Sequence, residues 1–270
     1  MLIDAHSHLN LEHLFQDWKI HLQHFQQIGG KILVNSGAHI DYNTNGILIA
    51  KEAKSLFPEL TVKATIGFHP RDSKEFVPED YPRLITQLEQ QYFENQDNII
   101  AIGECGIDLY GSDNPPLEHQ QTLFKLQANL AKKLNLPLVI HSRDGFEATM
   151  EVLKDFTDLK IYFHCRGYGP DEVRIVEELL PQVRFGFTNI LSYPSAKKTR
   201  ESLLTVKRSH ILLETDAPFL PPQTLRGQTN YPEHVKYVYE KCAEVLELEK
   251  EEVEKMIEEN FHTIFWNHPD

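Results

Sequence analysis

The chain has 270 residues, of which 41% are hydrophobic and 25% charged. This balance is typical of a globular protein and excludes a disordered or fibrous chain. The 27 basic and 40 acidic residues give a net charge of −13, which by itself argues against a nucleic-acid partner. Three cysteines without regular spacing exclude a disulfide framework. The first residues lack the features of a signal peptide and no apolar run approaches the length of a membrane span, so we expect a cytoplasmic protein without membrane contact.

Eight short apolar runs recur along the chain, and most are nearly continuous in Val, Ile, Leu and Phe. Runs of this kind predict parallel strands that are buried on both faces. They cover residues 2–3, 31–35, 61–67, 98–103, 137–141, 160–164, 183–187 and 211–214.

Segments with helical periodicity lie between these runs. The clearest predicted helix follows Asn114-Pro115-Pro116, carries a stripe of leucines and ends before Pro137. The other helices are predicted over residues 11–28, 40–56, 79–92, 145–156, 171–180, 195–206, 232–246 and 250–265. Eight strands that alternate with helices over about 250 residues are typical of a (β/α)8 TIM barrel, so we expect this α/β fold in one domain over residues 1–270. A doubly wound sheet is the alternative, because local patterns do not show closure.

Polar residues that bind metals stand near the ends of several predicted strands. His6 and His8 lie two residues apart on an extended chain, so their imidazoles point the same way and can share one ion. Other strand ends carry four more candidate ligands, which are Glu104, His141, His164 and Asp216. Barrel active sites form where the carboxyl ends of the strands meet. The sequence therefore predicts that these six side chains converge there around metal.

Six protein ligands are more than one tetrahedral catalytic ion takes, so we expect two divalent ions. Two-metal sites hold their ions roughly 3.5–4 Å apart, and a carboxylate is the natural bridge between them. Glu104 is the candidate bridge, because it comes from the middle of the strand order. Imidazole and carboxylate ligands suit Zn, Mn, Co or Ni, while Mg, which also stays possible, prefers sites made only of oxygen.

Several motifs resemble those of the TatD family of metal-dependent deoxyribonucleases, and the resemblance spans essentially the whole chain. They are Asp4-Ala5-His6-Ser7-His8, Gly67-Phe68-His69-Pro70, the segment 103–110, the Asn-Pro-Pro that follows it, His141-Ser142-Arg143-Asp144 and the segment 214–220. The resemblance implies a TIM barrel of the amidohydrolase superfamily that hydrolyses phosphodiester bonds. It implies that His6, His8, Glu104 and Asp216 hold one ion, that Glu104, His141 and His164 hold the other, and that the enzyme is a 3′-5′ exonuclease.

The chain departs from the family pattern at two places. The family usually has His-Cys-Phe-Ser-Gly where this chain has His164-Cys165-Arg166-Gly167-Tyr168-Gly169, so the loop gains a guanidinium and a phenol. Arg71 stands where the family often carries another histidine. The change in the loop after the sixth strand bears on substrate preference, and neither departure changes the predicted ligand set.

A mechanism follows as a hypothesis. The ions would lower the pKa of a water molecule to about 7 and neutralise charge on the phosphate. Asp216 is the expected general base and Glu104 the second catalytic carboxylate, while His69, Arg143 and Arg226 are the candidates for binding phosphate. The expected partner is DNA, as single strands or 3′ ends, and no obligate protein partner is evident.

Three other functions compete with this hypothesis. A glycoside hydrolase would use a glutamate after the fourth strand but has no role for four histidines. An amidohydrolase or esterase would use the same two ions on a C–N or C–O bond of a small molecule and remains the alternative. A non-catalytic binding protein on a retained fold is disfavoured by the complete ligand set.

The negative charge of the chain is concentrated away from the predicted ligands. Residues 244–259 include eight glutamates and two lysines, which is −6 of the total −13. Two divalent ions would bring +4 to the site, against −2 from its two carboxylates and −1 from a hydroxide, which leaves about +1. The net charge therefore still allows a nucleic-acid substrate.

Overall fold

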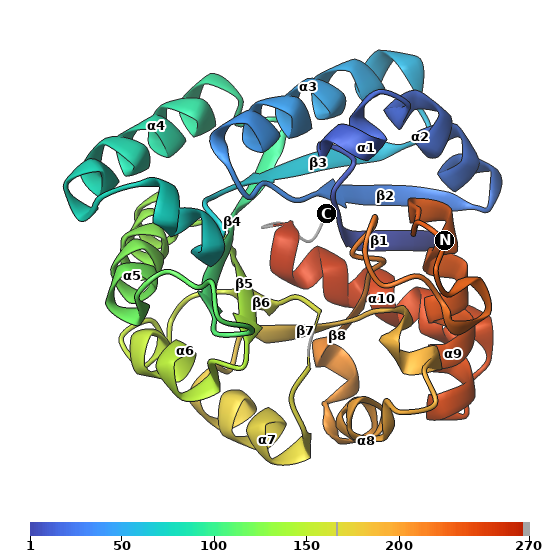
Figure 1. Cartoon of the computed structure of the whole chain (residues 1–270). Helices are drawn as coiled ribbons and strands as arrows, with labels where there is room; N and C mark the ends of the chain where they lie inside the picture. Colours follow the sequence, from blue (N-terminus) through green and yellow to red (C-terminus); the bar gives the residue numbers. More distant parts are fainter. Residues whose placement is uncertain (166, 267–270) are drawn as a thin grey trace.

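The computed structural model describes residues 1–165 and 167–266. Within these residues, eight parallel strands form one sheet in which each strand pairs with the next along the chain. They are β1 (Leu2–Ser7), β2 (Gly30–Asn35), β3 (Thr61–Ile66), β4 (Ile99–Asp108), β5 (Leu138–Arg143), β6 (Ile161–Phe163), β7 (Val183–Phe187) and β8 (Ile211–Leu213). Figure 1 shows the strands at the centre of a ring of helices. The (β/α)8 barrel predicted from the sequence is confirmed.

The last strand returns to the first and nearly closes the barrel. Just beyond β8, the backbone N–H of Asp216 donates to the carbonyl of His6 at 2.9 Å, and the N–H of His8 donates to the carbonyl of Ala217 at 2.7 Å. These bonds join segments about 210 residues apart in the sequence. They also fix two of the predicted ligands beside a third.

The helices lie outside the sheet because each buries one apolar face against it. They are α1 (Glu12–Phe15), α2 (Trp18–Gln27), α3 (Ile40–Leu56), α4 (Tyr81–Glu94), α5 (Leu117–Leu134), α6 (Phe146–Leu153), α7 (Pro170–Leu179), α8 (Lys197–Thr205), α9 (Val235–Leu246) and α10 (Lys250–Phe265). In α5, Leu123 and Leu130 of the predicted stripe are buried. No helix among the described residues combines the length and the apolar character that crossing a bilayer requires.

Some predicted boundaries are wrong. The helix expected over residues 11–28 is broken into α1, which ends at Phe15, and α2, which begins at Trp18, because the backbone of Asp17 leaves the helical conformation with a φ of −113° and a ψ of 17°. Strands β1 and β4 extend past their apolar runs, so that His6 and Glu104 lie inside strands instead of after them. The hydropathy pattern ends early there because polar side chains replace apolar ones, while the backbone pairing continues.

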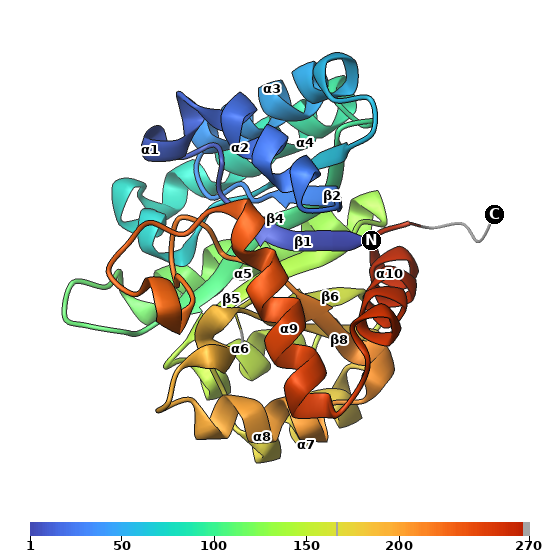
Figure 2. The ribbon, with the colours of Figure 1, turned by 90° about the vertical axis from the view of Figure 1, so that its right-hand side faces the viewer.

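The two ends of the barrel differ in character. Figure 2 shows the loops after β4 and β8 projecting from one end, while the N-terminus and α10 lie at the other. Helix α10 packs under the barrel, where the Phe265 ring meets the Tyr162 ring at 5.8 Å between centroids. The glutamate-rich segment 244–259 overlaps the first part of α10, and its Glu254 pairs with the terminal amine of Met1 at 2.7 Å. The acidic end is therefore opposite the carboxyl ends of the strands.

Two glutamines of α5 fasten the loops after β3 and β4. Gln127 accepts the N–H of Phe68 at 2.8 Å and donates to its carbonyl at 3.1 Å. Gln120 accepts the N–H of Asp108 at 2.8 Å and donates to its carbonyl at 3.1 Å. Both amides are fully buried. Each amide pairs with the backbone N–H and carbonyl of one residue, as a neighbouring strand would.

Replacing Gln127 with Leu removes both partners of the Phe68 backbone and leaves buried polar groups without hydrogen bonds. We expect Gln127→Leu to lower the free energy of unfolding by about 1–3 kcal/mol, measured by urea denaturation. The matched control is Gln90→Leu, because Gln90 is exposed and bonds only to Glu94 on its own helix. An equal loss in both variants would contradict this role for Gln127.

Candidate metal centre

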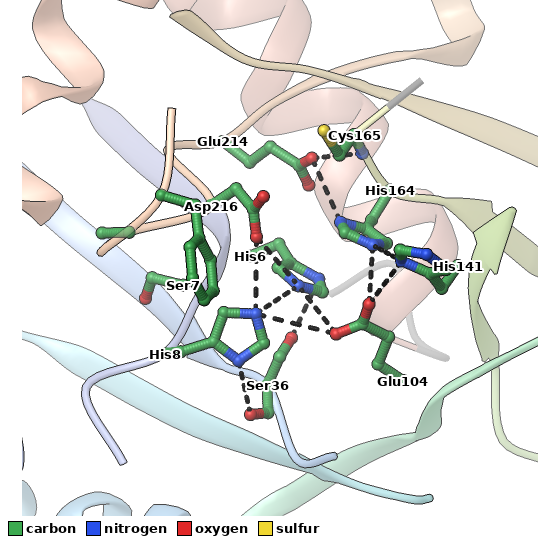
Figure 3. A network of polar contacts seen from close by, with 12 residues as sticks. His6, Ser7, His8, Ser36, Glu104, His141, His164, Cys165, Glu214 and Asp216 are labelled. Atoms are coloured by element: carbon green, nitrogen blue, oxygen red, sulfur yellow. Dashed lines mark hydrogen bonds and ion pairs between the residues drawn. The ribbon is translucent and has the colours of Figure 1, made fainter. Parts of the chain in front are cut away.

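The structure brings the six predicted ligands together at the carboxyl end of the barrel. His6 lies in β1, Glu104 in β4 and His141 in β5. The other three ligands follow strands: His8 comes directly after β1, His164 directly after β6, and Asp216 three residues after the end of β8. All are buried except His141, which is partly exposed. Figure 3 shows their polar ends turned toward one another.

Glu104 stands between two groups of ligands, with one oxygen toward each (Figure 3). Its Oε2 is 3.5 Å from Nε2 of His6 and 3.6 Å from Nε2 of His8. The preceding Gly103 has a φ of +133°, and a Cβ there would lie 2.4 Å from the carbonyl oxygen of Val139 on β5. Only glycine fits so close to β5 in that conformation, so the residue before Glu104 sets the approach of the two strands.

The first group consists of His6, His8 and Asp216 beside Oε2 of Glu104. The two Nε2 atoms are 3.1 Å apart, and Oδ1 of Asp216 is 3.7 Å from Nε2 of His6 and 3.4 Å from Nε2 of His8. Ligand atoms about 2.1 Å from one tetrahedral ion lie roughly 3.4 Å from each other. These side chains therefore fit a single divalent ion.

The second group consists of His141 and His164 beside the other oxygen of Glu104. Oε1 of Glu104 is 2.9 Å from Nδ1 of His141 and 2.8 Å from Nε2 of His164, and the two nitrogens are 3.2 Å apart. These three atoms point at a common position and also fit an ion. One oxygen of the Glu104 carboxylate thus faces each group, and its role as a bridge between two ions stays a prediction.

The buried charges of the site favour a cation. Burial by itself raises the pKa of Glu104, but the charge of His164 and hydrogen bonds from the surrounding histidines hold that pKa well below its usual value. Burial lowers the pKa of His164, yet Glu104 and Glu214 together bring it well above its usual value. Carboxylates that draw protons onto neighbouring imidazoles in this way draw divalent ions for the same reason.

Side chains around the ligands hold the rings in place, and the sequence gives little sign of them. Ser36 shares a hydrogen bond with Nδ1 of His6 at 2.9 Å, and its carbonyl is 3.2 Å from Nδ1 of His8. Asp108 lies 3.1 Å from Nε2 of His141. Such partners fix the tautomer and orientation of a ligating histidine. Ser36 follows a strand with no motif around it, while Asp108 sits in the segment that carries Glu104.

Glu214 supports His164 from inside the barrel. Its Oε1 is 3.7 Å from Nδ1 of His164 and accepts the backbone N–H of Cys165, and its Oε2 accepts the hydroxyl of Tyr162. The Tyr162 ring in turn rests on α10. The position of His164 is thus connected through the barrel interior to the opposite end of the molecule.

Of the predicted phosphate-binding residues, only His69 reaches the ligands. Its Nε2 is 3.6 Å from Oε1 of Glu104, and its Nδ1 accepts the N–H of Arg71 at 3.2 Å. Burial, followed by the charge of His141, lowers the pKa of His69 to about 3. The ring is therefore neutral near pH 7, with its proton on Nε2, where it can donate into the site.

Arg143 is the last residue of β5 and Arg226 lies in the loop after β8, and both are exposed. The Arg143 guanidinium stacks 3.6 Å from the centroid of the Tyr110 ring, and the Arg226 guanidinium lies 4.6 Å from that of Tyr193. Stacking keeps each guanidinium extended, with its N–H groups free to bind an anion.

The loop after β6, where the chain departs from the family pattern, is only partly described. Arg166 lies outside the described residues. The Tyr168 hydroxyl bonds to Ser142 at 2.8 Å, and its ring packs on Phe146. This phenol therefore supports the loops of β5 and β6, and its expected effect on substrate preference stays a prediction.

Comparison with known proteins identifies the family. The family model described as TatD related DNase matches residues 3–266. The chain belongs to the TatD family. It is 30% identical over 267 residues to the uncharacterized metal-dependent hydrolase YabD of Bacillus subtilis, a match that covers 98% of this chain and 99% of that protein. The resemblance predicted from the motifs is confirmed, and the chain is a metal-dependent hydrolase of this family.

Other TatD proteins agree in fold and in part of the sequence. The crystal structure of YJJV, a TatD homologue from Escherichia coli K12, matches with a TM-score of 0.88 at 26% identity, over 99% of this chain and 98% of that chain. The human 3'-5' RNA nuclease TATDN2 is 34% identical over 185 residues, which cover 66% of this chain and 23% of that protein.

An acidic hollow lies next to the metal centre of this TatD protein. It is lined by the short helical segment Pro70–Glu75, which follows His69, and by the start of α3. Burial raises the pKa of Asp72 in this hollow to about 6, with the charge of His39 opposing the rise. The folded protein therefore holds the Asp72 proton more tightly than the unfolded chain does.

This proton affects stability in a defined pH range. The contribution of protonated Asp72 is fully present below about pH 4 and is lost as the pH rises through about 6. We expect Asp72→Asn to raise the free energy of unfolding at pH 7 by about 1–2 kcal/mol, since solvent reduces the full effect of the shift. At pH 4 the gain is much smaller. Urea denaturation at the two pH values measures the gain in the free energy of unfolding, with Asp41→Asn as the exposed control. A gain that does not depend on pH would contradict the raised pKa of Asp72.

Proposed function

We propose that this TatD-family hydrolase is a metal-dependent deoxyribonuclease that cleaves phosphodiester bonds from the 3′ end of single-stranded DNA. The observation that carries the proposal is the position of Glu104, which offers one carboxylate oxygen to each of two ligand groups. A pair of ions held in this way suits phosphoryl chemistry, where both the attacking and the leaving oxygen need charge neutralisation. The description of the family model and the printed name of the human relative support the same class of substrate.

The proposed ligand sets are those implied by the motifs, with one ion held by His6, His8, Glu104 and Asp216, and the other by Glu104, His141 and His164. Zn, Mn, Co and Ni suit this mixture of imidazole and carboxylate, and Mg stays possible. When bound, two divalent ions lower the pKa of water and neutralise charge on a phosphate.

The side chains of the protein supply the remaining steps. Asp216 has one oxygen among the first ligand group, so we assign its second oxygen to accept the proton of the attacking water. His69 donates from Nε2 to a phosphate oxygen, because its Nδ1 already accepts the N–H of Arg71. Glu104, the second catalytic carboxylate, holds the two ligand groups at a fixed distance from each other during the reaction.

The loops around the site are suited to unpaired bases. Tyr110 and Phe219 are 51% and 50% exposed, and the Phe219 ring lies 6.0 Å from the ring of His8. Single-stranded nucleic acids bind where exposed aromatic rings stack on bases and cations contact the backbone. Arg143 stands beside Tyr110 in this arrangement. Bases paired in a duplex cannot stack on these rings, which favours single-stranded ends.

The decisive variant removes a ligand of the second group. We expect His164→Ala to lower metal-dependent hydrolysis of a 3′-labelled single-stranded oligonucleotide by at least about 100-fold, measured by gel electrophoresis with and without chelator and with Mg, Mn or Zn added back. His24→Ala is the control, because His24 lies on the outside of α2. Cleavage by His164→Ala at the rate of the wild type would contradict the proposal. Hydrolysis of amide or ester substrates in place of DNA or RNA would favour the amidohydrolase or esterase alternative.

The exposed rings give a separate prediction. Base stacking on an aromatic side chain is worth about 1–3 kcal/mol by alanine substitution, so Tyr110→Ala and Phe219→Ala should each raise KM for single-stranded DNA by about 5-fold or more. Neither should change hydrolysis of bis(p-nitrophenyl) phosphate, which has no nucleobase. Equal losses on both substrates would show that the rings support the fold of the site instead of binding bases.

A further inference from the structure

A second polar pocket lies at the end of the barrel opposite the metal centre. It has a volume of about 190 Å³ and is lined by Lys160, Gln182, Arg184, His210 and Thr263, among others. Lys160 and Gln182 directly precede β6 and β7, and Thr263 belongs to α10, which covers this end. At about 30 Å³ for each water molecule, the volume corresponds to about six waters, which is enough room for a tetrahedral oxyanion.

Arg184 is the unusual residue of this pocket. Only 7% of it is exposed, and its Nη1 donates to the carbonyl of Val183 at 2.8 Å. Its Nε is buried without a hydrogen-bond partner. Within residues 1–165 and 167–266, no carboxylate forms an ion pair with it. A buried cation without a paired anion is destabilising by several kcal/mol, so an anion is the missing partner.

The carboxylate of Glu177, which contacts the pocket residue His210, is already engaged. Oε1 of Glu177 lies 2.7 Å from Nδ1 of His210 and accepts the N–H of Lys207 at 3.0 Å. Burial lowers the pKa of Arg184 to about 10, and no carboxylate in the described part of the chain opposes this shift. Burial and the charge of Arg184 also lower the pKa of Lys160, which places the two cations close to one another. Both side chains line the same pocket, and two neighbouring cations suit an anion with several oxygens.

We propose that this pocket binds inorganic phosphate or a phosphate monoester, with the Arg184 guanidinium as its principal ligand and Lys160 beside it. The fork of a guanidinium matches two oxygens of a phosphate. The pocket shares no residue with the metal centre, so the proposal does not rest on the proposed nuclease function.

Thermal unfolding of the full-length, metal-loaded protein tests the proposal. Sodium phosphate should raise the Tm of the wild type by about 2–4 °C more than sodium chloride at equal ionic strength. Arg184→Met retains the metal centre and should lose this extra rise, because phosphate bound at the metals affects both proteins equally. The control is Arg174→Met, which removes an exposed arginine paired with Asp171 and should keep the rise.

The outcomes separate clearly. An equal phosphate effect in wild type and Arg184→Met, or no effect beyond that of chloride in the wild type, overturns the proposal. A larger rise with acetate than with phosphate overturns the assignment to phosphate. If Arg184→Met does not fold, ³¹P NMR titration of Arg184→Lys replaces it. Lysine keeps the charge but loses the fork, so phosphate should bind about tenfold more weakly than to the wild type, and equal affinity contradicts the proposed role.

Discussion

A buried carboxylate on the fourth strand sets the arrangement of this molecule. Glu104 is only 3% exposed, and a carboxylate removed from water is stable only among cations or hydrogen-bond donors. Imidazoles from β1, β5 and the end of β6 meet that requirement, and each ring is held by a further polar group behind it. The order of the strands in the barrel determines which histidines lie beside each oxygen of Glu104. The two ligand groups are therefore a direct result of the barrel topology. The proposed pair of ions would complete a charge balance that the fold already requires.

The distribution of charge follows the same division between the two ends. The net charge of −13 suggests an unfavourable surface for nucleic acid, yet the glutamates of α10 lie at the end away from the ligands (Figure 2). The carboxyl end of the barrel instead carries Arg143, at the end of β5, and Arg226, in the loop after β8, each stacked on a tyrosine. Fields from charges at the far end are screened within about 8–10 Å in physiological salt. Local charge at the site therefore determines what it attracts.

Much of this could be predicted from the sequence because strands buried on both faces have continuous apolar runs, and because His, Glu and Asp have few other uses at strand ends. The closure of the barrel could not be predicted from local patterns, since it depends on hydrogen bonds such as that between Asp216 and His6, which are about 210 residues apart. The ends of β1 and β4 were also missed, because polar ligands interrupt the apolar pattern inside a strand. Ser36 and Glu214 carry no local signal of their contacts with histidines, and the stacking of Arg143 on Tyr110 depends on loop conformations that periodicity does not encode.

The two glutamines of α5 have a consequence for how such a chain can vary. Gln120 and Gln127 are seven residues apart, which is two helical turns and places them on the same face. One residue inserted or deleted between them would rotate one amide by about 100° and release either the loop after β3 or the loop after β4. The number of residues between these two glutamines is therefore constrained by the structure. Helices that hold no loop in this way can lengthen or shorten during evolution without disturbing the spacing of the side chains at the centre.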